Sequence, residues 1–564
     1  MSRRRPSAAT ADALGLVEST PYAGLAALFT HAFLTVAFLV FINASSPFVL
    51  RTTLAARVPA GASGSATSRL LLADELTALS LYLPIGALSD SAEWGLKRCT
   101  VAGYVVVAAA LAAYVRAPSL NWLIAARVVF AVGGSTLVTT MSALLLQMSA
   151  IPDEVVYGTT SPPLGSVGSA PTEESRLLND SARRTGATTS SSTWGSARSF
   201  RKSSRSAGVL AFAGGLGAVV AVFGFLRLPT LFARLSPAGD ADSPEALRFG
   251  LRATFHTLAA IAILQAGFLA CALPATAAGA AFEQREGPER SFKAAMRETG
   301  AKLIRGFKLG AQDGNIAVGY ASSFASRAQT TVTNAFLPLL IERYFSKYHL
   351  CDVEPTNPLG SPTQVLDRDS CRRAYLLASA LTGVVQLLSL VLSPVVGYAA
   401  SSSSLMATTT TPMTIRAARH PQAAVLGLAS LIGAVSFVGY SALPHDGDPR
   451  SGLAWVYATG VGIAQAAGVV LSLALVTTGR GIVVSSTGGA GAGAAAAAAD
   501  PAIRGREIAG TLSGAYGFSG GLGILVVGAS AGFGFDQWPG APFALMAAID
   551  LVVVVGAAML YRRS

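Results

Sequence analysis

The chain has 564 residues, of which 52% are apolar and only 13% are charged, and its mean hydropathy is +0.51. So few charges cannot cover the surface of an ordinary soluble domain, whereas apolar runs of about 20 residues can cross a bilayer as helices. The formal net charge of +12 lies in the polar loops, so it indicates topology and not a nucleic-acid partner. These features predict an all-α integral membrane protein that resides in the lipid bilayer.

Twelve apolar segments predict twelve transmembrane helices. In chain order they are expected near 23–48, 70–90, 99–116, 119–148, 207–228, 252–275, 314–341, 373–399, 423–443, 452–478, 508–531 and 540–561. An even number of spans puts both termini on one side, and the loops on that side hold more Lys and Arg. Both termini should therefore be cytoplasmic, in either the plasma or the vacuolar membrane.

The connections divide the chain into two halves joined by a linker. The expected parts are a cytoplasmic tail (1–22), a first six-helix half (23–280), a basic cytoplasmic linker (281–313) and a second six-helix half (314–564). The longer loops are 149–206, 342–372 and 479–507. The first is rich in Ser, Thr, Gly and Arg and should be a disordered cytoplasmic loop, the second is external, and the third is cytoplasmic and of low complexity.

Two motifs recur six spans apart. Pro84-Ile-Gly86 closes the second span and Pro394-Val-Val-Gly397 closes the eighth. The fifth and eleventh spans contain two matching glycine runs: Gly214, Gly215 and Gly217, then Gly520, Gly521 and Gly523. This repeat predicts two pseudo-symmetric six-helix bundles. Small residues let helix backbones approach closely, so these glycines could line a moving seam or could serve ordinary helix packing.

A short loop motif follows the second span. Gly86-Ala-Leu-Ser-Asp90, then Gly95-Leu-Lys97-Arg98, resembles the signature loop between the second and third helices of the major facilitator superfamily. Ser91 stands where that pattern has its first basic residue, and the turn here is longer. Asp90 could pair with Lys97 or Arg98 and latch the cytoplasmic side shut, or the cluster could be a plain topogenic signal.

A second resemblance extends over most spans, to a fungal branch of this superfamily loosely related to drug:proton antiporters. It rests on Asn43-Ala-Ser-Ser-Pro-Phe-Val-Leu50, Asp74-Glu75, Tyr320-Ala-Ser-Ser-Phe-Ala-Ser-Arg327, Cys371-Arg-Arg-Ala-Tyr-Leu-Leu-Ala378 with Gln386, and 510–523. The resemblance implies the twelve-helix major facilitator fold and secondary transport of a small molecule by alternating access. Protons are the candidate coupling ion, in efflux or antiport, and no cofactor is implied.

Charged residues inside the spans are candidates for the transport pathway, because a charge in the bilayer normally faces water or a partner. Asp74 and Glu75 lie near the outer end of the second span. One of them could bind a proton, or both could be solvated at the membrane edge. Arg127 in the fourth span matches an Arg of superfamily antiporters, so it could serve proton coupling or could snorkel to the outer surface.

The seventh span carries a polar stripe. Arg327 shares a helical face with Thr331 and Asn334, so this face should line a cavity, although Arg327 could instead be a structural residue paired with a carboxylate. Three neutral hydrogen-bonding side chains lie deep in spans one, eight and ten: Asn43, Gln386 and Gln465. They suit a substrate site, and bonds between helices are the alternative.

Cysteine and histidine positions bear on other classes of function. Cys351 and Cys371 bracket the external loop and could form a disulfide there. With four cysteines and no Cys/His cluster, no metal site is expected. The histidines are scattered, so no grouping indicates an enzyme. The remaining alternative is a transporter-like receptor that signals through its cytoplasmic loops. We expect a monomer.

Overall fold

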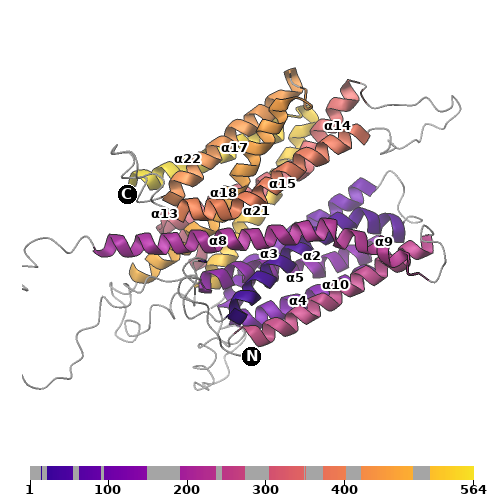
Figure 1. The fold of residues 1–564 in the computed structure, drawn as a ribbon, viewed down its shortest axis with the longest axis horizontal. Coiled ribbons are helices and arrows are strands. Elements are labelled where there is room, and N and C mark those ends of the chain that lie inside the picture. The colour runs from indigo at the N-terminus through magenta and orange to yellow at the C-terminus, as the bar shows by residue number, and fades with distance from the viewer. Residues whose placement is uncertain are drawn as a thin grey trace, which may run out of the picture.

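The computed structural model is all-helical in the residues it describes (Figure 1). These residues are 14, 22–54, 63–90, 95–148, 191–236, 244–273, 304–348, 350, 372–401, 421–446, 448–486 and 508–563. Cys351 and Cys371 lie outside them, so the disulfide stays a prediction.

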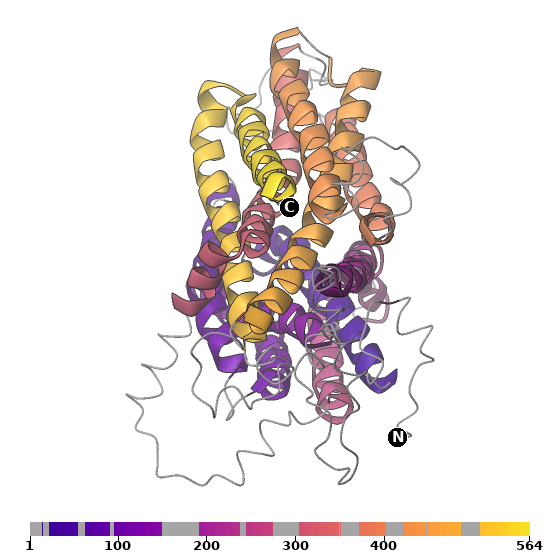
Figure 2. The same ribbon diagram turned by 90° about the vertical axis from the view of Figure 1, so that its left-hand side faces the viewer.

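The helices form two groups, coloured indigo to magenta and red to yellow in Figure 1. The first half contains α2 (Tyr22–Leu54), α3 (Ser63–Ser89), α4 (Gly95–Tyr114), α5 (Leu120–Met148), α8 (Ser191–Phe223), η3 (Phe225–Arg227), α9 (Leu228–Ala233) and α10 (Pro244–Ala272). The second half contains α13 (Gly314–Thr331), η4 (Val332–Phe336), α14 (Leu337–Lys347), α15 (Arg372–Ser401), α17 (Pro421–Asp446), α18 (Gly452–Ser486), α21 (Ala509–Gln537) and α22 (Ala541–Arg563). Figure 2 shows the same two groups from the side.

Each predicted span corresponds to a helix in the described residues. Ten helices there are long and apolar enough to cross a membrane. The other two predicted spans are α3 and the α13–η4–α14 segment, whose charged and hydroxyl side chains make them more polar. Large apolar side chains such as Leu264, Val435 and Val552 are exposed on the outside of the bundle, as expected where helices face lipid.

The two halves repeat the same packing scheme. In the first half α2 packs on α8, α3 on α5, and α4 on α10; in the second half α13 packs on α21, α15 on α18, and α17 on α22. The halves meet through α3 with α21 and through α15 with α8, which are equivalent pairs in this scheme. The helix contacts therefore have the pseudo-two-fold symmetry that the motif repeat predicts.

Both meetings occur near one end of the bundle. We call this the linker end, since α3, α5 and α10 finish there and α13 and α21 begin there; the other is the opposite end. At the linker end, a Cβ on Gly86 would lie 2.8 Å from the Cα of Gly514, and a Cβ on Gly208 would lie 3.2 Å from the Cα of Gly397. Only glycines allow backbones to approach this closely.

The repeated glycine runs lie on both sides of these crossings. Gly214 and Gly217 face α2, at Val36 and the carbonyl of Phe33, while Gly215 faces Leu390 of the other half. The equivalent residues of α21 behave alike: Gly520 and Gly523 face α13, and Gly521 faces Tyr82 and Leu79 of α3 across the seam. The same runs thus serve packing within a half and contact between halves.

Several helices extend beyond the predicted spans, and four of them show this most clearly. Helix α3 begins at Ser63, and α8 begins at Ser191, inside the predicted 149–206 loop. Helices α14 and α18 continue to Lys347 and Ser486, into the predicted 342–372 and 479–507 loops. Residues 304–312 of the predicted linker are also helical. Hydropathy detects the lipid-embedded part of a helix, and polar turns that continue into water give no such signal.

We expect replacement of Gly217 by Leu to destabilise the first half, because its side chain would fall on the backbone of Phe33. Overpacking of this kind costs about 1–3 kcal/mol. The unfolding midpoint of the purified protein in detergent should fall. Gly383→Leu is the control, since nothing lies within 4 Å of a Cβ there. Equal midpoints for the two variants would contradict this packing.

Candidate functional site

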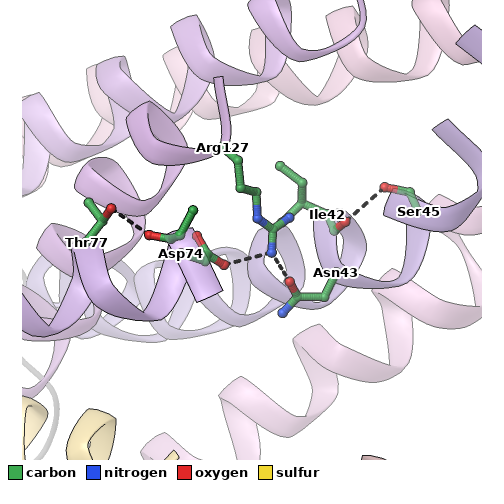
Figure 3. Close-up of polar contacts among 7 residues, drawn as sticks. Ile42, Asn43, Ser45, Asp74, Thr77 and Arg127 are labelled. Atoms are coloured by element: carbon green, nitrogen blue, oxygen red, sulfur yellow. Dashed lines mark hydrogen bonds and ion pairs between the residues drawn. The ribbon is translucent and has the colours of Figure 1, made fainter. Parts of the chain in front are cut away.

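A buried ion pair joins three helices of the first half (Figure 3). Arg127 Nη2 on α5 lies 2.7 Å from Asp74 Oδ2 on α3, and it also donates to Asn43 Oδ1 on α2. Only 1% of the Arg127 side chain and 15% of the Asp74 side chain are exposed. The guanidinium also lies 5.7 Å from the ring centroid of Phe130. This burial excludes the alternative in which Arg127 snorkels to the surface.

Asp74 lies about three turns inside α3, because the helix begins at Ser63, in polar turns that precede the predicted apolar span. Its side chain is largely buried, so the carboxylate needs a partner, and Arg127 supplies it. The structure therefore brings together three of the predicted pathway residues, Asn43, Asp74 and Arg127, in one network within the first half.

Glu75 points in another direction, because adjacent helical residues are about 100° apart. It interacts electrostatically with Arg327 of the second half as well as with Asp74 and Arg127. Among the described residues it has no partner within hydrogen-bond distance. The side chain of Arg327 is exposed and also lies beside Gly520 of α21. Charges from both halves thus meet at the middle of the seam.

The second half contributes a chain of neutral hydrogen bonds. Gln465 Nε2 on α18 donates to Thr330 Oγ1 (3.1 Å) and to Gln386 Oε1 (3.3 Å). Gln386 Nε2 on α15 donates to Asn334 Oδ1 (3.1 Å). Gln465 is buried, whereas Asn334 is exposed, so the chain runs from the core of the half toward its surface. Thr331 directly follows Thr330 but is not part of this chain, because its hydroxyl donates to the backbone oxygen of Arg327.

A π-helical turn sets the position of Asn334. The segment η4 is a π-helix over Val332–Phe336, directly before Pro338. Proline has no backbone N–H to donate to the preceding turn, and a wide turn is one way to accommodate it. Such turns recur at functional sites because they shift the side chains that follow. Here the wide turn carries Asn334 to Gln386 of α15.

Asp90 connects the halves at the linker end. Its Oδ1 accepts from Gly510 N (2.6 Å), and its Oδ2 accepts from Thr511 N (2.5 Å) and Thr511 Oγ1 (2.6 Å). These are the first backbone amides of α21, where a helix end stabilises a negative charge. The prediction named Lys97 or Arg98 as partners of Asp90, and that pairing stays a prediction; the structure adds the contacts with Gly510 and Thr511 of the other half.

The rest of the signature loop lies on α4. Gly95 begins that helix with φ of 60°, a conformation that side-chain-bearing residues rarely adopt. Lys97 is half-buried and Arg98 is exposed on the first turn. The Asp90 carboxylate, directly after α3, faces the start of α21.

Hydroxyl side chains also connect the two halves at the linker end. Ser142 Oγ of α5 lies 2.6 Å from Ser513 Oγ of α21, and Ser203 Oγ of α8 lies 3.2 Å from Thr478 Oγ1 of α18. At the position equivalent to Asp90, Ser401 accepts a hydrogen bond from Arg205 Nε (3.0 Å). All these side chains except Arg205 are buried or nearly so, and they tie the first half to the second.

Two buried titratable residues were not among the predicted site residues. His31 is fully buried, with Tyr104 Oη at 3.0 Å from Nδ1 and Thr140 Oγ1 at 3.3 Å from Nε2, so it is a satisfied core residue. Asp550 is buried in α22 and bonds Gln329. A single acid in a very apolar span was the signal for it. No cluster of three His, Cys, Asp or Glu that could bind a metal occurs in the described part of the chain.

Comparisons with solved structures identify the fold. The chain matches the proton:xylose symporter XylE bound to 6-bromo-6-deoxy-D-glucose, with a TM-score of 0.52 and 12% identity, over 95% of this chain and 94% of that one. It matches the human organic anion transporter MFSD10 (TETRAN) with a TM-score of 0.51 and 15% identity, over 95% and 99%. No family model matches the sequence, and no curated protein matches it. The chain has the major facilitator fold, as predicted.

We expect Asp74→Ala and Arg127→Ala each to lower the unfolding midpoint markedly. Removing one partner of a buried ion pair leaves an uncompensated charge and costs about 3–5 kcal/mol. The double variant should lose less stability than the two single variants together. The same cycle at the exposed Asp448–Arg450 pair is the control and should change little. Additive losses at Asp74 and Arg127 would contradict direct pairing.

We expect Asp90→Ala to open the linker end. Hydrogen bonds to a charged group contribute about 1.5–3 kcal/mol each, so loss of three of them should favour separation of the halves. A water-soluble maleimide should label a cysteine at the buried position 142 at least about tenfold faster, equivalent to ~1.4 kcal/mol. The four native cysteines are first replaced. If Lys97→Ala accelerates labelling and Asp90→Ala does not, the hydrogen bonds between Asp90 and α21 do not keep the linker end closed.

Proposed function

We propose that the protein is a secondary active transporter of the major facilitator superfamily that moves a small molecule between its two halves by alternating access. One observation carries the proposal: charged and amide side chains of both halves lie near a seam whose glycine crossings and hydrogen bonds between the halves gather at the linker end. Among the described glycines, Gly521 meets Leu79 and Gly215 meets Leu390 across this seam.

The conformation corresponds to one state of that cycle. The glycine crossings, the Asp90 bonds and the buried hydroxyl contacts all lie at the linker end. If the loop charges place this end in the cytoplasm, as the positive-inside rule predicts, the closed cytoplasmic side makes this an outward-facing state. Rocking of the halves about the seam would then break these contacts and expose the site to the cytoplasm.

We propose that the substrate binds among Arg327, Asn334 and Gln386 of the second half, with the exposed Asn43 as a candidate contact from the first half. Arg327 and Asn334 are exposed although they lie mid-span, so they have polar groups to offer a ligand. Gln465 donates a hydrogen bond to the amide oxygen of Gln386, and this bond orients the Gln386 amide. An oriented guanidinium and amide pair suits a hydroxylated or anionic small molecule.

We further propose that Glu75 carries a coupling proton. Asp74 is paired with Arg127, whereas Glu75 interacts electrostatically with Asp74, Arg327 and Arg127 and has no hydrogen-bond partner among the described residues. A proton on Glu75 would remove its attraction for Arg327, which would free the guanidinium for a substrate or loosen the seam. Proton movement and substrate binding would then compete at one arginine, as coupled transport requires.

We expect Arg327→Ala to abolish flux without loss of folding. The test is uptake into liposomes reconstituted with the purified protein, with radiolabelled sugars and organic anions as the first panel, following the two matched transporters. Arg116→Ala, in an exposed turn, is the control and should transport normally. Retained transport by Arg327→Ala would remove this residue from the pathway. Failure of the wild-type protein to move any compound in a broad screen would favour the receptor alternative.

We expect Glu75→Gln to separate exchange from accumulation. This change fixes the neutral form, so a pH gradient should no longer drive concentration of substrate, while exchange of internal for external substrate should persist. Glu342→Gln, on an exposed part of α14, makes the same chemical change elsewhere. Wild-type accumulation that ignores the pH gradient would reject proton coupling and leave transport itself intact.

A further inference from the structure

Asp550 is a buried acid outside the seam. It is the tenth residue of α22, which runs over Ala541–Arg563, so it lies near the middle of the membrane span. Only 1% of the residue is exposed. Helix α22 packs against α13, α17 and α21 of its own half. The residue therefore has no place in the pathway proposed above and needs a separate explanation.

Its two carboxylate oxygens have unequal surroundings. Oδ1 lies 2.8 Å from Gln329 Nε2 of α13. Oδ2 is buried and has no hydrogen-bond partner among the described residues, and the same is true of Gln329 Oε1. On the other side of Oδ2 is Gly433 of α17, where a Cβ would lie 2.8 Å from that oxygen and 2.6 Å from the Cβ of Ala464. The carboxyl group of Asp550 is thus paired with one amide, that of Gln329, in an otherwise apolar environment.

No described cation faces Asp550 from the helices packed on it. On α13 the charged residue is Arg327, which is two positions from Gln329, so it lies on the other face, where it is exposed at the seam. The tyrosine hydroxyls of these helices are bonded elsewhere: Tyr440 to Ala454 O, Tyr320 to Gly306 O and Tyr516 to Ser472 Oγ. On α17 and α21 the remaining titratable residues are His445, Asp446 and Asp536, all near the opposite end. The segment η4 has none.

We propose that Asp550 is a proton-binding site that holds a proton in this conformation, with Gln329 as its hydrogen-bond partner. A neutral carboxylic acid has one O–H to donate, and an O–H on Oδ2 could be donated to the amide oxygen of Gln329 while Oδ1 keeps accepting from Nε2. That arrangement leaves no charge in the low-dielectric interior and satisfies the unpartnered amide oxygen. A bound metal cation fits less well, because hard cations require about six oxygen ligands.

The site connects an outer helix to a seam helix. Gln329 precedes Thr330, which binds Gln465 in the polar chain of the second half. In the first half the equivalent helices, α10 and α2, are joined by Gln265 Nε2 and Thr30 Oγ1 at 2.9 Å, a neutral pair. Helix packing at this position therefore does not require an acid. A proton at Asp550 would hold α22 to α13, and its loss would weaken that attachment. This inference does not depend on transport.

Infrared spectroscopy of the purified full-length protein in liposomes tests the proposal at neutral pH. Wild-type minus Asp550→Asn should show the C=O stretch of a protonated carboxylic acid, which shifts on deuterium exchange. Asp448→Asn is the matched control, because hydrogen bonds from Arg450 hold the pKa of Asp448 below its usual range, so no acid band should be lost. Loss of a carboxylate band in Asp550→Asn, or no difference, would overturn the proposal.

A second variant serves if Asp550→Asn does not fold. Gly433→Ala places a methyl group against Oδ2, so it should shift the frequency of the acid band and leave the band present. The unfolding midpoint of the wild type should also fall at alkaline pH, because the native state binds one more proton than the unfolded chain. An unshifted band in Gly433→Ala, or stabilisation by sodium ions that Asp550→Asn abolishes, would count against a proton.

Discussion

The close approach of backbones at the linker end is the constraint on which the rest of the structure depends. Gly86 meets Gly514 and Gly208 meets Gly397 with no room for side chains between them. Because the two crossings are related by the pseudo-two-fold symmetry of the halves, they fix where the seam closes. They also place Asp90 against the first turn of α21, so a single carboxylate can reinforce the contact with three hydrogen bonds.

The membrane interior explains how the charged residues are arranged. Arg127 is neutralised by Asp74 within one half, and Glu75 and Arg327 interact across the seam. A fixed ion pair suits a structural role, whereas charges held only by electrostatic attraction across a movable interface can exchange partners. No described cation lies beside Asp550, and the proton proposed above would neutralise its buried carboxylate. The Arg127–Asp74 pair and Asp550 therefore stabilise contacts within one half, whereas Glu75 and Arg327 can respond to a ligand at the seam.

The sequence predicted more of the fold than of the site. Hydropathy located each span, because lipid burial depends on local composition. The paired motifs contain one glycine of each crossing, Gly86 and Gly397, but they did not indicate which helix each one meets. Pairing of Arg127 with Asp74 and Asn43 depends on three helices far apart in sequence, so no local pattern could show it. Asp90 was expected to act as a latch, but its contacts with the first turn of α21 were not predicted, because two of them are with backbone amides, which leave no residue-type signal. Asp550 was missed although a lone acid in an apolar span is itself a signal, because no motif surrounds it.

Distances between the halves measured at both ends test the central claim most directly. Spin labels at Arg116 and Gly452 report the opposite end, and labels at Arg98 and Lys308 report the linker end. Pulsed electron paramagnetic resonance on the reconstituted protein, with and without a transported compound, should show two populations whose distances change in opposite directions at the two ends. A single unchanging distance at each end, under conditions in which flux is measured, would contradict alternating access about this seam.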